Sequence, residues 1–154
     1  MAFSGSSLCT SFKVEILKGA HDFTASTGDT FKFAMYNNSA TFTAATTAYT
    51  ATNEVAASGT GTNPYAAGGG TLVSATPVAD GTTAICDFAD ITFTAATITA
   101  YGALIYNTTP TSGSGLTNPT VCVLDFGGAK TSTAGDFTIV FPGATAAVAI
   151  IRIA

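Results

Sequence analysis

Charged side chains are scarce in this sequence. They make up 9% of the 154 residues, whereas an ordinary globular protein carries about 25%. The chain has only five Lys and Arg residues, and nucleic-acid binding requires several phosphate contacts, so we expect no nucleic acid as a partner. Because interface cores are depleted of charge, the composition favours a protein that packs against other subunits. The other interpretation is an extracellular domain with a Thr-rich coat.

Histidine and cysteine are also rare. The three cysteines, Cys9, Cys86 and Cys122, are odd in number and widely spaced, which predicts neither a disulfide framework nor a zinc site. Cys86 and Cys122 lie among strand residues and are expected to be small buried hydrophobes. The one histidine, His21, follows a predicted helix, and no Gly-x-Ser-x-Gly motif accompanies it. His21 is therefore predicted to interact with the helix dipole, and we expect neither an enzyme nor a cofactor site.

Two acidic residues, Asp87 and Asp90, lie three positions apart. Paired carboxylates can perform acid–base chemistry or bind calcium. Strand alternation places these two on opposite faces, and a calcium site needs more oxygen ligands than they supply. We predict that Asp90 has a cap or turn role before Ile91.

Long hydrophobic runs are missing as well. No stretch approaches the 18 apolar residues that indicate a membrane span, so we expect no membrane partner. The N-terminal ten residues lack the basic and apolar regions of a secretory signal. We therefore expect synthesis in a cytoplasm.

One helix is predicted, over residues 6–18. Leu8, Phe12 and Ile16 recur at every fourth position and form one apolar stripe. Ser6 or Ser7 can cap the start, and Gly19 can take the left-handed position after the end. The stripe either anchors the protein to a partner or covers the open end of the β-structure.

Period-two alternation replaces the helical pattern from residue 30 onward. Thr97–Tyr106 is apolar on both faces and is predicted to be a central strand. Residues 40–70 are rich in Thr, Ala and Gly and are predicted to form a long contact loop. Seven to nine short strands separated by Gly, Pro and Asn turns predict an all-β fold. We expect a single domain over residues 1–154, an antiparallel β-sandwich or jelly-roll-like barrel spanning 30–154.

Several phrases of the sequence stand out: Ser11–Lys13, Phe31–Tyr36, Thr46–Val55, Gly68–Gly70, Ala100–Asn107 and Val123–Gly127. Together they resemble a family of small structural proteins from the virions of tailed bacteriophages. The likeness covers nearly the whole chain, and its phrases are structural rather than catalytic. The chain departs from the commoner pattern in a longer loop at Gly113–Asn118, so we expect its loop contacts to differ. The resemblance implies a non-enzymatic virion protein, such as a head decoration (cement) protein.

Such a protein would bind other virion proteins, with the major capsid protein first among them, and a closed homotrimer would suit three-fold capsid positions. Candidate subunit contacts are Leu8, Phe12, Ile16, Tyr49 and Tyr65. An alternative is a tail or fibre component that binds a host-surface glycan on exposed Tyr49, Tyr65 and Tyr106. A third hypothesis, a hydrolase using His21, Asp87 and Asp90, has no motif behind it.

Overall fold

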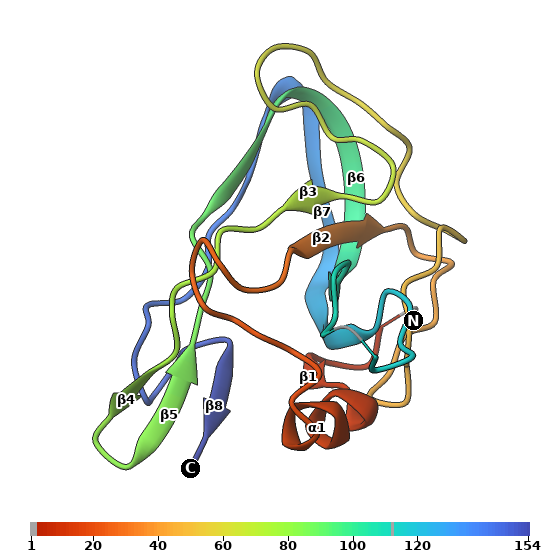
Figure 1. Cartoon of the computed structure of the whole chain (residues 1–154). Coiled ribbons are helices and arrows are strands. Elements are labelled where there is room, and N and C mark those ends of the chain that lie inside the picture. The colour runs from red at the N-terminus through yellow and green to blue at the C-terminus, as the bar shows by residue number, and fades with distance from the viewer. Residues whose placement is uncertain (1–2, 112) are drawn as a thin grey trace.

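Eight strands and one short helix form the regular structure of residues 3–111 and 113–154, the part of the chain that the computed structural model describes (Figure 1). Five strands form one antiparallel sheet in the order β1-β7-β6-β2-β3, and three form a second in the order β4-β5-β8. The elements are β1 (Ser7–Leu8), α1 (Thr10–Leu17), β2 (Phe31–Tyr36), β3 (Gly70–Thr71), β4 (Val78–Asp80), β5 (Thr83–Cys86), β6 (Ile91–Asn107), β7 (Thr120–Ile139) and β8 (Ile151–Ile153). The predicted all-β, antiparallel class with one short helix is confirmed.

The long strands β6 and β7 form the frame of the fold. They pair antiparallel from Ile91↔Ile139 to Tyr106↔Thr120, and β6 lies between β7 and β2, the central place predicted for Thr97–Tyr106. The paired ribbon bends sharply at the top of Figure 1. Register shifts lie on both sides of the Ala96↔Gly135 pair, and such bulges let a strand turn a corner.

Strand β7 is longer than the sequence predicts. The sequence pattern predicts that Gly127-Gly128 ends one strand and that another begins at Phe137, and this prediction is wrong. The ladder continues from Gly102↔Asp125 to Ala100↔Lys130, so three extra residues of β7 loop out between these pairs. Gly127 and Gly128 have φ values of +69° and +139°, which glycine adopts without steric cost, and the pairing then resumes.

Aromatic side chains fill the inside of the bent ribbon. Phe23 and Phe31 stack with ring centroids 4.2 Å apart, Phe31 contacts Phe88 at 5.8 Å, and Phe88 contacts Phe141 at 5.8 Å. This chain of contacts joins β2, the segment after β5 and the segment after β7. The two sheets therefore share one hydrophobic core.

The segment from 37 to 69 has no named strand or helix and is held by isolated bridges, such as Ser58↔Tyr65. It leads into β3, which crosses closely over the core. A Cβ atom on Gly69 would lie 2.0 Å from the Phe33 carbonyl oxygen, and one on Gly70 would lie 2.5 Å from Ile91 Cδ1. The glycines at these positions allow β3 to pack against β2 and β6.

The helix is shorter than predicted. It spans Thr10–Leu17 rather than 6–18, because Ser7 and Leu8 pair with Val123 and Cys122 as strand β1. Cys9 occupies the N-cap position without a side-chain hydrogen bond, so neither Ser6 nor Ser7 caps the helix. Gly19 follows with φ +69°, the left-handed residue that was predicted after the helix.

Candidate functional site

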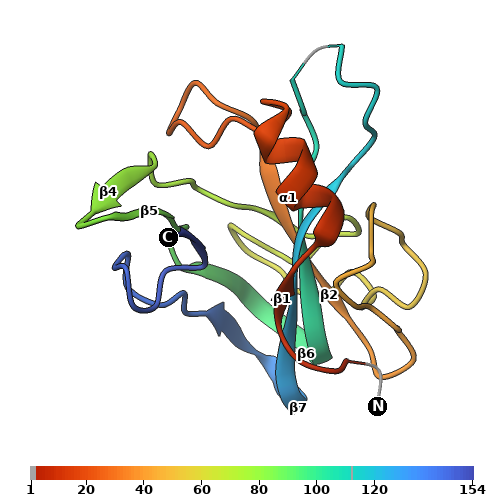
Figure 2. The ribbon, with the colours of Figure 1, turned by 90° about the horizontal axis from the view of Figure 1, so that it is seen from below.

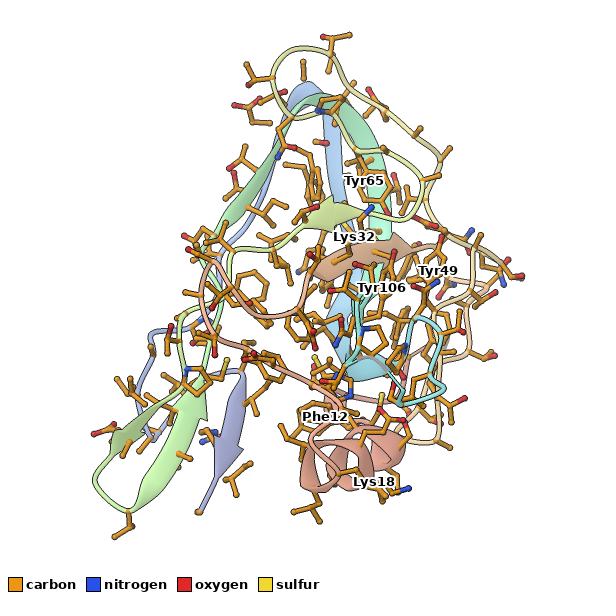
Figure 3. All side chains as sticks on the ribbon, in the orientation of Figure 1. Phe12, Lys18, Lys32, Tyr49, Tyr65 and Tyr106 are labelled. Atoms are coloured by element: carbon orange, nitrogen blue, oxygen red, sulfur yellow. The ribbon has the colours of Figure 1, made fainter. Side chains whose placement is uncertain are left out.

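The stripe of Leu8, Phe12 and Ile16 is divided between two elements. Leu8 belongs to β1 and is half-buried, as is Ile16 on α1, whereas the Phe12 side chain is 1% exposed. The Phe12 ring packs edge-on against Phe23 at 6.0 Å and lies on the side of α1 that faces the sheets (Figure 3). Phe12 therefore holds the helix to the core and cannot itself be the anchor.

The outer face of α1 carries two apolar residues that do not belong to the predicted stripe. Val14 is 49% exposed and Leu17 is 88% exposed. They lie three positions apart, so they are neighbours on the helix surface, and the exposed Lys13 and Lys18 flank them. This pair is the exposed apolar part of the α1 surface.

His21 belongs to a buried polar network at the base of α1. Its Nε2 atom lies 2.9 Å from Glu15 Oε2, and its Nδ1 atom lies 3.0 Å from Asn107 Nδ2. Asn107 Nδ2 also donates to Asp29 Oδ2 at 2.7 Å. A neutral imidazole that donates from Nε2 and accepts at Nδ1 satisfies all these contacts.

This network ties three segments together. Glu15 lies on α1, His21 and Asp29 on the connection to β2, and Asn107 at the end of β6. Among the described residues, no hydroxyl or thiol group forms a hydrogen bond with His21, so the arrangement lacks the nucleophile of a triad. The His21–Glu15 contact replaces the simple helix-dipole role predicted for His21.

The tyrosines predicted as contact or glycan platforms surround Glu54 instead. Tyr49 donates to Glu54 Oε2 at 2.6 Å, Tyr65 donates to Oε1 at 2.9 Å, and the Gly68 N–H donates to Oε1 at 2.8 Å. Tyr49 stacks on Tyr106 with centroids 4.5 Å apart, and Figure 3 shows Tyr49, Tyr65 and Tyr106 gathered beside β2.

These tyrosines offer little open ring surface. Tyr65 is 1% exposed, Tyr106 is 3% exposed, and Tyr49 is half-buried. Burial raises the pKa of Tyr106 to about 12, and burial together with Glu54 raises the pKa of both Tyr49 and Tyr65 above its ordinary value. The expectation that all three are exposed is wrong, because loop 48–68 folds back over β2 and β6.

Asp87 and Asp90 also have separate roles. Asp90 Oδ1 accepts a 2.8 Å hydrogen bond from the Phe141 N–H, so it fixes the chain after β7. Asp87 is 3% exposed, and its Oδ1 accepts from the Phe88 N–H at 2.9 Å. Burial raises the pKa of the Asp87 carboxyl. The two carboxylates share no hydrogen-bond partner, which argues against joint acid–base chemistry.

The cysteines are free and buried, as predicted for Cys86 and Cys122. Burial raises the pKa of Cys86 to about 12 and that of Cys122 above its ordinary value. No group of three or more His, Cys, Asp and Glu residues within 3–111 and 113–154 could hold a metal ion. In the same described part of the chain, no helix is long and apolar enough to cross a membrane.

Exposed apolar side chains are the remaining candidate for function. Seven large ones are between 49% and 88% exposed: Val14, Leu17, Val73, Val78, Val140, Val148 and Ile153. In addition, β7 pairs with β1 only at Cys122 and Val123, so its outer edge beyond them faces no strand among the described residues. Unpaired edges and exposed apolar residues mark surfaces that other chains can cover.

Comparison of the chain with models of known protein families, with curated protein sequences and with solved structures found no match. The functional argument therefore depends on the residues and their geometry.

Proposed function

We propose that this chain is a non-enzymatic structural subunit of a bacteriophage virion. It decorates or cements the head, binds the major capsid protein and acts as a homotrimer. The observation that carries this proposal is a surface poor in charge and supplied with exposed apolar side chains. The resemblance of its sequence phrases to small virion proteins supports a role in a virion.

The energetic logic of a cement protein fits this surface. Each copy gains a modest free energy from burying a few apolar side chains, at about 25 cal/mol per Å² of apolar surface removed from water. Copies joined as a trimer engage the head at three points, and the second and third contacts are intramolecular. An uncharged contact surface lets such contacts form without the desolvation penalty of buried ions.

The outer face of α1 is the best supported attachment surface. Leu17 is the most exposed of the seven apolar residues, at 88%, and Val14 lies beside it. The core holds the opposite side of α1 through Phe12, so the helix presents these two residues on a fixed support.

Binding of a host-surface glycan by a tail component is the rival function. Its support is weaker because Tyr65 and Tyr106 are covered and only Tyr49 keeps part of its ring accessible. A sugar would need a stacking surface that these side chains do not offer together.

The test is co-sedimentation of the purified protein with phage heads that lack it. We expect the wild-type protein to bind heads at a stoichiometry that is a multiple of three. Leu17→Glu should lower head occupancy, whereas Val73→Glu, on an exposed valine of another segment, should not. Absence of binding by folded wild-type protein, together with a signal on a glycan array, would favour the rival function.

A further inference from the structure

The three-stranded sheet has two unpaired edges. Its order is β4-β5-β8, and neither the outer side of β4 nor that of β8 pairs with another strand in residues 3–111 and 113–154. All three residues of β4 are exposed. The apolar Val78 on β4 and Ile153 on β8 are 55% and 54% exposed. Figures 1 and 2 both show this sheet at the side of the molecule, with β4 outermost.

The two edges carry opposite charges on the same face of the sheet. Val78 pairs with Ile85, and Ile85 pairs with Arg152, so these three side chains share one face. Asp80 is two residues from Val78 and belongs to that face too.

Neither Asp80 nor Arg152 has an oppositely charged group within 4.0 Å among the described residues. The Ala146 N–H donates to Asp80 Oδ2 at 2.6 Å, and Arg152 Nη1 donates to the Ala146 and Ala147 carbonyl oxygens. Asp80 Oδ1 and the other Arg152 N–H groups have no hydrogen-bond partner among the described residues.

The opposite face of this sheet is small and apolar. Ala79 pairs with Ala84, and Ala84 pairs with Ile153, so these residues share a face, and all three are exposed. An exposed row of this kind gains free energy when it is turned toward the interior of an assembly.

The outer side of β8 also has room beside it. A groove of about 400 Å³ lies between the C-terminal segment and β1, and Arg152, Ile150, Val148, Leu8 and Leu124 contribute to its lining. Val148 in its wall is 50% exposed. The groove can therefore take side chains from a strand added next to β8.

We infer that β4 of one copy of this chain pairs with β8 of the next copy, head to tail, and that three copies close into a ring. Strands β4 and β8 are both antiparallel to β5, so they are parallel to each other. Rotation about an axis along the strands brings β4 of the next copy alongside β8. A stagger of two residues places Asp80 of that copy beside Arg152.

Closure favours three copies. A head-to-tail interface must close into a ring or it produces an open filament. Three copies contribute nine strands. This number is close to the eight strands of a barrel whose interior is filled by side chains. The Ala79–Ala84–Ile153 row would then face the inside and the Asp80–Arg152 pairs the outside. This inference rests on the homotrimer of the proposed function and is independent of the virion and the head.

A disulfide test examines the contact directly. Within one copy, β5 separates Asp80 from Arg152, so their Cα atoms are at least two strand spacings, roughly 9–10 Å, apart. A disulfide spans at most about 7 Å, so a bond between these positions must join two copies. Under mild oxidation, the double variant Asp80→Cys/Arg152→Cys should give linked species that stop at the trimer. Each single variant can give at most a dimer.

Light scattering on the unoxidised protein supplies the second readout. We expect a trimeric mass for the wild type and for Leu17→Glu, and a monomeric mass for Val78→Glu and Ile153→Glu with unchanged circular dichroism. The β4–β8 contact would be overturned if the wild type is a trimer, both glutamate variants are trimers too, and the double cysteine variant forms no disulfide. That result would leave the proposed trimer intact. A monomeric wild type would overturn the contact and the trimer, and head binding would then test the remaining part of the proposed function.

Discussion

Ala95 and Ala134 adopt the same left-handed backbone, with φ 48° in each, at the bend of the β6–β7 ribbon. A side chain of the opposite strand holds each one. The Ala95 N–H donates to Asp136 Oδ1 at 3.1 Å, and the Ala134 N–H donates to Thr97 Oγ1 at 2.9 Å. The corner that encloses the aromatic core thus depends on two alanines in a conformation that disfavours a Cβ atom.

Relief of this strain should stabilise the protein. A left-handed non-glycine residue costs about 1–2 kcal/mol, and glycine gives back about 0.5–1 kcal/mol through greater freedom of the unfolded chain. We expect Ala95→Gly and Ala134→Gly each to raise the free energy of unfolding by up to about 1 kcal/mol, measured by urea denaturation. The control is Ala100→Gly on β6, the strand of Ala95. Ala100 does not have a positive φ, so this substitution should lower the free energy of unfolding. Destabilisation by all three substitutions would contradict the strain argument.

Glu54 is expected to be the principal stabiliser of the 48–68 loop. Glu54→Ala removes the acceptor for the Tyr49 and Tyr65 hydroxyls and for the Gly68 N–H. A buried donor left without a partner costs about 1–3 kcal/mol, so we expect a loss of about 2–3 kcal/mol in the free energy of unfolding. Glu54→Gln keeps an acceptor oxygen and should lose less. Equal losses in the two variants would show that the carboxylate oxygens are not what the tyrosines require.

The buried tyrosines should make the fold sensitive to alkali. Burial raises the pKa of Tyr106 to about 12 and raises the pKa of Tyr36, Tyr49 and Tyr65 as well. A group whose folded-state pKa is raised gives stability that is complete below its unfolded pKa and is lost as pH rises through the folded pKa. Stability should therefore fall from about pH 10 upward, the unfolded tyrosine pKa.

Ultraviolet titration of tyrosinate would check this expectation. The native protein should hold most of its tyrosines un-ionised at a pH where the urea-unfolded chain has ionised all of them. Coincident titration curves for the native and unfolded protein would contradict the burial of Tyr36, Tyr49, Tyr65 and Tyr106.

Truncation should destabilise the protein strongly at Phe12 and hardly at all at Leu17, although both are apolar residues of α1. Phe12 is 1% exposed and Leu17 is 88% exposed. Phe12→Ala should lower the free energy of unfolding by about 3–5 kcal/mol through the cavity it leaves, and Leu17→Ala should leave it within about 0.5 kcal/mol. Thermal unfolding measures both. A large loss for Leu17→Ala would mean that its side chain is covered in the folded chain.

The sequence by itself determined the class of the fold. Alternation and turn residues are local properties, so they predicted the antiparallel strands, the central place of Thr97–Tyr106, the loop at 40–70 and the glycine that ends α1. The scarcity of charge and of catalytic motifs likewise predicted a function that depends on surface contacts and not on an active site.

Tertiary structure decided everything that depends on partners distant in the chain. Leu8 became part of a strand because β7 was available to pair with it, and Gly127-Gly128 became a bulge because β6 continued alongside. Tyr106 was covered because the Gly68 carbonyl, 38 residues away in the chain, accepts its hydroxyl hydrogen bond. Glu54 of the same loop accepts the hydrogen bond of Tyr65. A side chain's periodicity shows which face it occupies, and only the packed fold shows whether that face meets the core or the solvent.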